Sequence, residues 1–338
     1  MINTNRIFPA ACMAAVALAA SAAVKVQMPP TCTNPDGLAV DPQDRLVIAA
    51  PNNARTQPGA IFRLDAPGGT PYLWFVVPPH PETGVASPMG ICFGPEGELY
   101  VCDNQKDSKG RLLRVTFKDD KPLAVETVAC GIENANGVKY LNGRLYMTQA
   151  FLRKLPREDG HLPSGLYMFS ATDRNVKVTN TAADPQLVFT DHTAGKIRVG
   201  MNGVAVDAKG TIYVDNYGEG RIWKLTPGAD GRIAASELFA WQDMKTPDGL
   251  CTDAEGNVYT ADMHAGSAVM IDRKGTVTTV AKDCFTKPSE PCVWRGRLYI
   301  SDYGSTTLTE IPLARCAQPR GLASEANRME DWTSCRPK

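Results

Sequence analysis

The chain has 338 residues, 43% hydrophobic and 21% charged, which is enough for one large core or two ordinary domains. Its 36 basic and 36 acidic side chains balance, and no block of Lys or Arg occurs. This pattern excludes the electrostatic footprint of a nucleic-acid or polybasic membrane binder, so we expect small-molecule or protein partners.

The N-terminus predicts a signal peptide over residues 1–23. One cation, Arg6, precedes an apolar run over residues 7–23 that ends in small residues suited to signal peptidase. The run is short for a span of a roughly 30 Å bilayer, so we expect export to the periplasm or the medium, with no membrane partner after cleavage. Lipid attachment at Cys12 and a buried N-terminal helix are the alternatives.

Six segments of residues 24–338 repeat one pattern. Each has a polar corner, a short apolar strand, a tight turn rich in Gly, Asp and Asn, and a second apolar strand, which contains a Tyr in all but the first segment. This pattern predicts a β-hairpin. The segments are NPDGLAVDPQDRLVIAA from Asn34, PMGICFGPEGELYVCDN from Pro88, ANGVKYLNGRLYMTQ from Ala135, MNGVAVDAKGTIYVDN from Met201, PDGLCTDAEGNVYTAD from Pro247 and PSEPCVWRGRLYISD from Pro288.

The sequence between successive hairpins has room for two more strands. We therefore predict an all-β fold, a single six-bladed β-propeller of four-stranded antiparallel blades over residues 24–338. A seven-bladed ring is the alternative, if the tail from Cys316 or the insert near residue 165 hides another blade. We expect the tyrosines of the second strands to pack between blades: Tyr100, Tyr146, Tyr213, Tyr259 and Tyr299.

The polar corners are expected to meet at one face of the ring. In antiparallel blades, the first strand starts where the second strand ends, so both sets of residues surround the axis. The corner residues are Asp36, Met89, Asn136, Asn202, Asp248 and Ser289, and the strand-end residues are Asp103, Asn216, Asp262 and Asp302. Such carboxylate and amide oxygens suit Ca²⁺ better than zinc. We predict a metal site made of Asp36, Asn136, Asn202 and Asp248, whereas Asp41, Asp207 and Asp253 lie in the opposite turns and are structural.

The arrangement resembles the gluconolactonase, regucalcin and luciferin-regenerating enzyme family, and more distantly the paraoxonases. The resemblance covers nearly all of residues 24–338 at the level of the repeat. Its most specific motifs are Asn202-Gly203 and PDG followed by C-x-D-A-E-G over residues 247–256. It implies a divalent cation, Ca²⁺ in preference to Mg²⁺, Mn²⁺ or Zn²⁺, held by Asp248 and Asn202, with Asn136 a weaker match.

One position departs from that family. The family has Glu-Gly-Pro in the first blade, where this chain has Asp36-Gly37-Leu38. The shorter carboxylate makes a bridging water between Asp36 and the cation an alternative to direct ligation.

The resemblance implies hydrolysis of a lactone or related ester, and we expect the protein to be a monomer. The cation is expected to act as a Lewis acid on the carbonyl oxygen and to help ionise a bound water. Asp248 is the expected general base, and His264, just after the second strand of the fifth hairpin, is an alternative proton carrier. Two other functions remain open: a metal-free enzyme resembling strictosidine synthase, and a non-catalytic binding module.

Loops are expected to set the substrate. The segment 151–165 carries Arg153, Lys154 and Arg157 and is either a lid for an anionic substrate or a mobile solvated loop. His192 precedes the fourth corner and is a second pocket candidate. Because export permits disulfides, we also expect them in the late pairs Cys284/Cys292 and Cys316/Cys335.

Overall fold

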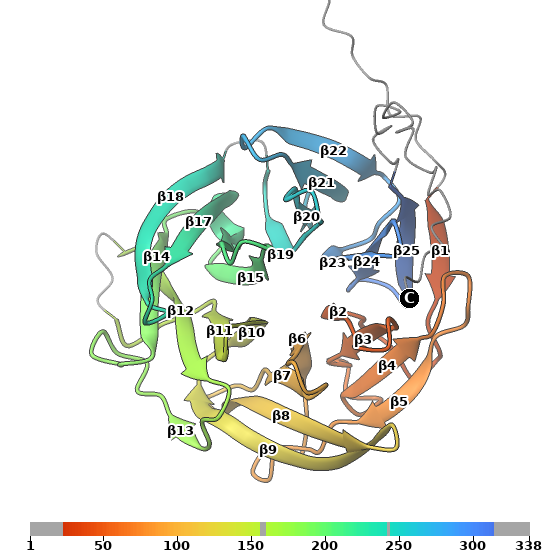
Figure 1. Cartoon of the computed structure of the whole chain (residues 1–338), viewed down its shortest axis with the longest axis horizontal. Helices are drawn as coiled ribbons and strands as arrows, with labels where there is room; N and C mark the ends of the chain where they lie inside the picture. The colour runs from red at the N-terminus through yellow and green to blue at the C-terminus, as the bar shows by residue number, and fades with distance from the viewer. Residues whose placement is uncertain (1–22, 156–159, 242–243, 314–338) are drawn as a thin grey trace, which may run out of the picture. The chain divides into compact units, whose positions relative to one another are not determined.

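The computed structural model describes residues 23–155, 160–241 and 244–313. Within these residues the regular structure is β-strand, apart from one short 3-10 helix, η2 (Tyr217–Glu219). Six sheets stand around a common axis, which confirms the predicted six-bladed β-propeller (Figure 1). Residues 1–22 of the predicted signal peptide, and Cys316 and Cys335, lie outside the described residues. Within the described part of the chain, no helix is long and apolar enough to cross a bilayer.

The strands follow the chain blade by blade. Blade one has β2 (Leu38–Val40), β3 (Leu46–Ala50), β4 (Ala60–Leu64) and β5 (Tyr72–Val76). Blade two has β6 (Pro88–Phe93), β7 (Leu99–Asp103), β8 (Gly110–Lys118) and β9 (Lys121–Ile132), and β13 (Val176–Lys177) adds a parallel fifth strand beside β9. Blade three has β10 (Ala135–Leu141), β11 (Arg144–Gln149), β12 (Leu162–Ser170) and β14 (Leu187–Thr193).

The second half of the ring repeats the same order. Blade four has β15 (Met201–Val206), β16 (Ile212–Asn216), β17 (Arg221–Pro227) and β18 (Ile233–Trp241). Blade five has β19 (Pro247–Thr252), β20 (Val258–Asp262), β21 (Ser267–Ile271) and β22 (Val277–Lys282). Blade six has β23 (Pro288–Trp294), β24 (Arg297–Asp302) and β25 (Thr307–Pro312).

The N-terminal strand completes the ring. β1 (Val24–Gln27) pairs antiparallel with β25, so the outermost strand of blade six comes from the beginning of the chain (Figure 1). The four residues of β1 do not follow the hairpin pattern, so the sequence did not predict this pairing. First and last blades are thereby joined by a ladder of backbone hydrogen bonds.

The core lies between neighbouring blades. Each of five apolar clusters takes its side chains mainly from two adjacent blades, because one blade alone cannot cover both of its faces. Tyr100, Tyr146, Tyr213 and Tyr299 are buried in four of these clusters, which confirms that they pack between blades. Tyr259 is buried as well, and its hydroxyl donates to Asp253 at 3.0 Å.

The hairpin turns behave as the sequence predicts. The turn glycines adopt positive φ, for example +82° at Gly97 and Gly210, and Asp44 takes the equivalent place in blade one with φ +58°. The side chains of Asp41, Asp207 and Asp253 accept hydrogen bonds from backbone N–H groups of their own turns. These three aspartates are therefore structural.

One prediction about the cysteines is wrong. Every cysteine in the described part of the chain is a free thiol, Cys284 and Cys292 included. Cys292 lies inside β23 and is buried, so it is not on a loop, where it was expected to meet Cys284.

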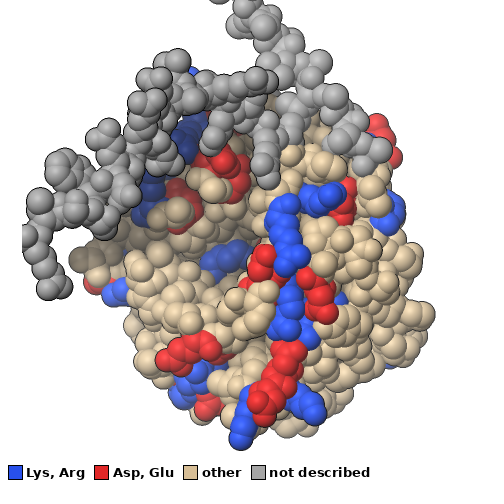
Figure 2. Space-filling model, turned by 45° about the vertical axis from the view of Figure 1, so that its right-hand side comes forward, with Lys and Arg blue, Asp and Glu red and all other residues tan. Residues whose placement is uncertain are grey.

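Charges on the surface are mixed. On the face shown in Figure 2, basic and acidic side chains lie next to one another rather than in separate patches. Ion pairs also join blades: Arg63 of β4 contacts Asp120, in the turn between β8 and β9, with 2.6 Å from Nη2 to Oδ2.

Candidate functional site

The six predicted corner residues line one cavity. It measures about 200 Å³ and lies where the innermost strands of the blades surround the axis. The structure thus brings together the four predicted metal-binding residues and the other two corner residues: Asp36, Met89, Asn136, Asn202, Asp248 and Ser289.

A backbone irregularity turns each corner toward the axis. The pairing of first and second strands shifts register at the corner in blades two to six, for example between Met201 and Val204 and between Asp248 and Leu250. Such a bulge re-aims a side chain that regular pairing would send to the neighbouring blade. The shift explains how residues at the start of a strand come to face a shared cavity.

The glycine after the corner in blades one to five allows the inner strands to meet. A Cβ on Gly90 would lie 2.4 Å from the carbonyl oxygen of Asn136, and one on Gly203 would lie 2.6 Å from the Cα of Gly249. Any larger residue would push these strands apart. The repeated Asn-Gly and Asp-Gly pairs therefore reflect packing around the axis as well as turn formation.

Side chains of the second strands hold the corners in place. In blade four, the Asp215 carboxylate accepts from the backbone N–H of Asn202 at 3.1 Å and from that of Gly203 at 3.0 Å. Equivalent positions in other blades carry hydroxyls: Thr148 accepts from Gly137 N–H at 2.8 Å, and Ser301 accepts from Glu290 N–H at 2.9 Å. These buried groups fix the corner backbone without lining the cavity.

Two buried carboxylates lie close together in the cavity. Ser289 Oγ donates to Asp36 Oδ1 and lies 3.3 Å from Asp248 Oδ2. Burial raises the pKa of Asp36 to about 6. Burial, followed by the negative charges of Asp36 and Glu290, holds the pKa of Asp248 well above its usual range. Within the described part of the chain, neither aspartate has a Lys or Arg ion-pair partner.

The donor set fits a hard cation. Asp36 and Asp248 supply carboxylates, and the side-chain amides of Asn136 and Asn202 have no hydrogen-bond partner among the described residues. These residues contain no group of three or more His, Cys, Asp or Glu placed to hold a metal ion, so a cation here would depend on amides and water besides two carboxylates. Oxygen ligands of this mixed kind suit Ca²⁺.

An ion pair crosses the axis near the two aspartates. Lys139 of β10 lies 3.3 Å from Glu290 of β23, measured from Nζ to Oε1, and these strands belong to blades on opposite sides of the ring. Glu290 occupies the place that glycine has in the other corners. Its burial raises its pKa to about 7, and Lys139 opposes that rise.

The strand-end residues have other roles. The Asp103 carboxylate binds Arg111, and that of Asp262 accepts from the backbone N–H groups of Lys245 and Thr246. Asp302 accepts from backbone N–H groups in the same way, and Asn216 donates to Asp191. Each of the four pairs with the residue just before its blade's corner, at the expected face of the ring, but none lines the cavity. The polar side-chain atoms of these four residues are already hydrogen-bonded to neighbouring groups.

His264 lies beside the cavity rather than in it. Its ring is exposed and packs edge-on against Tyr217, with 6.0 Å between ring centroids. Tyr217 is a lining residue and His264 is not. The role of His264 as a proton carrier stays a prediction.

The expected lid also lies elsewhere. Arg153 N–H donates to Glu133, and Lys154 Nζ donates to the Thr179 carbonyl at 3.1 Å, so both residues are held at the loops of blade three. Neither these residues nor His192 lines the cavity, and Arg157 lies outside the described residues.

Tyr217 and Tyr303 also line the cavity, although the sequence pattern did not predict this. Tyr217 follows β16 and Tyr303 follows β24, so each stands one position after a strand end. Burial, helped by the charges of Asp36 and Asp248, raises the pKa of Tyr303 to about 12. The repeat places the ends of the second strands at this face, so the residue after each strand end was the signal for both tyrosines.

Part of the chain matches a known family. Residues 201–303 match the family described as SMP-30/Gluconolactonase/LRE-like region. The matched stretch includes three of the cavity's corner residues, Asn202, Asp248 and Ser289. The resemblance predicted from the repeat and its motifs is thereby confirmed. Among curated protein sequences, none matches this chain.

Solved structures share the fold. A gluconolactonase from Xanthomonas campestris is 17% identical with a TM-score of 0.59, and the match covers 86% of this chain and 89% of that one. A luciferin-regenerating enzyme is 13% identical, with a TM-score of 0.57 and coverages of 86% and 95%. A streptogramin B lyase is 11% identical, with a TM-score of 0.54 and coverages of 87% and 98%. At these identities the likeness establishes the fold, which carries more than one activity.

Proposed function

We propose that this chain, whose residues 201–303 match the SMP-30/gluconolactonase/LRE-like family, is a metal-dependent hydrolase of a lactone or related ester. The observation that carries the proposal is the cavity on the axis, where the buried carboxylates of Asp36 and Asp248 lack a basic partner among the described residues. A divalent cation would neutralise this buried negative charge, which is costly to leave unpaired.

Asp36, Asn136, Asn202 and Asp248 would hold the cation, with Ca²⁺ the best match to their oxygens. When bound, the cation supplies Lewis-acid polarisation of the substrate carbonyl and lowers the pKa of a water. Ser289 keeps Asp36 and Asp248 in a fixed relation through its hydroxyl. Bulges hold the corners of Asn136, Asn202 and Asp248, and backbone hydrogen bonds with Ala49 hold the corner of Asp36.

Asp248 would take the proton from the attacking water. The water oxygen adds to the carbonyl carbon, the bond from this carbon to the ring or ester oxygen breaks, and the proton passes to the alcohol oxygen that leaves. The Asp248 carboxylate lines the cavity, with Oδ2 3.3 Å from Ser289 Oγ, so it can reach a water bound among the proposed ligands. His264, packed against Tyr217, is the second candidate to carry this proton.

Asp248→Asn tests the proposal. The change keeps the shape of the side chain and removes its charge. We expect calcium affinity, measured by titration calorimetry, to fall at least about tenfold and hydrolysis of a lactone and aryl-ester panel to fall about 100-fold or more. Asp253→Asn in the opposite turn of the same hairpin is the matched control and should keep both. Full activity of the wild-type protein in excess chelator would rule out metal dependence.

Export is part of the same proposal. Residues 1–23 would direct secretion and then be removed. N-terminal sequencing of protein recovered from a host's periplasm or medium should find a chain that begins near residue 24, and a protein retained whole in the cytoplasm would contradict export.

A further inference from the structure

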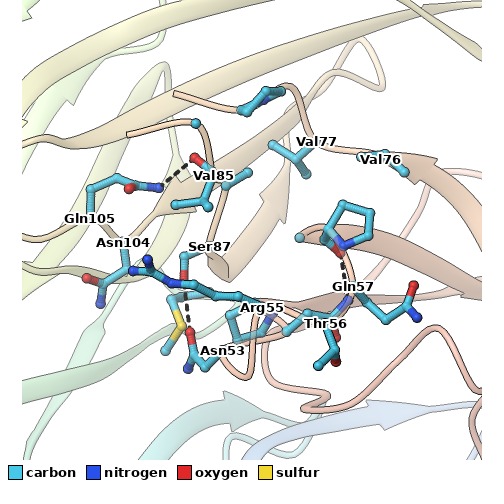
Figure 3. A pocket seen from close by; sticks show the side chains of 18 of the residues that line it. Asn53, Arg55, Thr56, Gln57, Val76, Val77, Val85, Ser87, Asn104 and Gln105 are labelled. Atoms are coloured by element: carbon cyan, nitrogen blue, oxygen red, sulfur yellow. Dashed lines mark hydrogen bonds between the residues drawn. The ribbon is translucent and has the colours of Figure 1, made fainter. Parts of the chain in front are cut away.

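A second, larger cavity lies on the same side of the ring. It measures about 520 Å³, a size typical of pockets for small organic ligands. Its walls come from loops of blades one and two, over residues 51–59, 76–87 and 104–106 (Figure 3). These loops follow β3, β5 and β7, whereas the predicted lid belongs to blade three.

The two cavities adjoin. Met89 and Tyr303 line both of them. Asn53 connects the blades at this boundary: its side-chain amide donates to the Tyr303 hydroxyl, and its Oδ1 accepts from Ser87 Oγ at 3.2 Å (Figure 3). A molecule with its carbonyl in the acidic cavity would therefore have its remaining part within reach of the larger cavity.

The charges of the two cavities are opposite. Arg55 and Lys106 are the charged residues that line the larger cavity, and no Asp or Glu lines it. Within the described part of the chain, neither cationic side chain forms an ion pair or hydrogen bond. Arg55 extends across the cavity toward Asn104 (Figure 3). Two free cations thus stand beside the two carboxylates of the neighbouring cavity.

The rest of the wall is mixed. Val76, Val77, Val85 and Ala86 give an apolar side, and the amide of Asn104 lies near Arg55. A ligand with an apolar body and an anionic end matches this distribution, because the body can cover the valines while the charge reaches Arg55 and Lys106.

We propose that the larger cavity binds the carboxylate-bearing part of the substrate, so that the preferred substrates are lactones or esters with an apolar body and a carboxylate. This inference rests on the proposed hydrolysis, since it assigns the substrate of that same site. Arg55 and Lys106 bind the carboxylate in it. Their charges also draw the substrate's carboxylate into the larger cavity and leave the carbonyl for the acidic cavity.

Matched esters test the proposal. Mono-4-nitrophenyl adipate and 4-nitrophenyl hexanoate have acyl chains of equal length, and only the adipate ester carries a free carboxylate. We expect Arg55→Glu to raise KM for the adipate ester about tenfold and to leave the hexanoate ester nearly unchanged. Lys106→Glu should act in the same direction. Lys209→Glu, an equal charge change on an exposed turn of blade four, is the control and should alter neither ester.

A binding assay separates this inference from the proposed function. Calorimetry with hexanoate and hexanamide compares a carboxylate with a neutral group and needs no turnover. We expect wild-type protein to prefer hexanoate, and this preference to weaken with added salt and in Arg55→Glu. Ester hydrolysis with no preference for the carboxylate in either assay would overturn the subsite and leave the hydrolase standing. A hexanoate preference that depends on Arg55, without hydrolysis of any ester, would support the subsite and refute the hydrolase.

Discussion

Asp215 influences the candidate site from outside the cavity. Its carboxylate accepts two adjacent backbone N–H groups, those of Asn202 and Gly203, and is fully buried. Burial, followed by the charge of Asp248, keeps the pKa of Asp215 well above its usual range. The residue has no contact with the cavity, so its effect on function passes through the position of Asn202.

Asp215→Ala should therefore reduce cation binding. The change leaves two buried N–H groups without an acceptor, which costs about 1–3 kcal/mol each. The corner should shift to recover partners and displace the Asn202 amide. We expect calcium affinity to fall about tenfold in titration calorimetry. Asp207→Ala, in the turn of the same hairpin, should lower stability and keep calcium affinity; equal affinity losses in both variants would refute the positioning role.

Asp120 gives a pH-dependent prediction away from the site. The hydrogen bonds and charge of Arg63, with help from Arg45, lower the pKa of Asp120. A lowered carboxyl pKa contributes stability above the unfolded value near 3.9, and this contribution disappears as pH falls through the folded value. We expect Asp120→Asn to lower Tm by about 2 °C at pH 6, with a smaller difference at pH 3, where Asp120 is partly protonated in the unfolded chain.

The control for that experiment is Asp119→Asn. Asp119 also has positive φ, +50° against +62° for Asp120, a conformation that Asn tolerates, and it forms no ion pair in the described part of the chain. Its Tm should match the wild-type value at both pH values. A Tm difference for Asp120→Asn that persists unchanged at pH 3 would exclude the ion pair as its cause.

The corner hairpin is the element that could be predicted best. Each hairpin is encoded by a short continuous stretch of sequence. The repeat of that stretch therefore predicts the strands, the turns and the face where Asp36, Asn136, Asn202 and Asp248 meet. The roles of Asp103, Asp262 and Asp302 could not be read in the same way. A strand-end aspartate can face the axis or accept from a loop backbone, and only the tertiary structure decides between them.

Loops were the least predictable elements. The expected cationic lid belongs to blade three, whereas the free cations over the large cavity are Arg55 and Lys106 of blades one and two. Side chains on loops have no periodic pattern that fixes their direction. Charge alone therefore could not distinguish Arg55 from Arg153.

Gly203→Ala tests the close packing of the inner strands. The added Cβ would lie 2.6 Å from Gly249 Cα and from Asp215 Oδ2, so adjacent blades must separate. We expect a loss of about 1–3 kcal/mol in the free energy of unfolding, measured in urea. Gly143→Ala has open space around it and positive φ, so it reports backbone strain alone. A calcium affinity that stays unchanged in Gly203→Ala would show that the corner tolerates this separation.

At the scale of the whole molecule, the ring closes through β1. The four residues Val24–Gln27 pair with β25 and bury Val26. The hairpin repeat predicted six blades, but it carried no information on a pairing between the two ends of the ring. Since β1 lies in blade six and the chain runs on from it into blade one, this ladder ties the first blade to the last.

Shortening the chain tests this closure. A protein that starts at Met28 lacks β1 and should lose about 3 kcal/mol in the free energy of unfolding, from the burial of Val26 and the backbone hydrogen bonds. A protein that starts at Ala23 keeps the strand and is the reference. Equal urea midpoints for the two proteins would show that β1 does not stabilise the closed ring.

The ion pair between Lys139 and Glu290 joins opposite sides of the ring. It joins strands of opposite blades, with Glu290 directly after the cavity residue Ser289, so charged side chains occupy the axis near the acidic cavity. The larger cavity, which carries Arg55 and Lys106, adjoins the acidic cavity through Met89 and Tyr303. Under the proposed function, a carboxylate product of ester cleavage would be attracted by the same two cations as a carboxylate substrate, so product inhibition should grow with the product's negative charge.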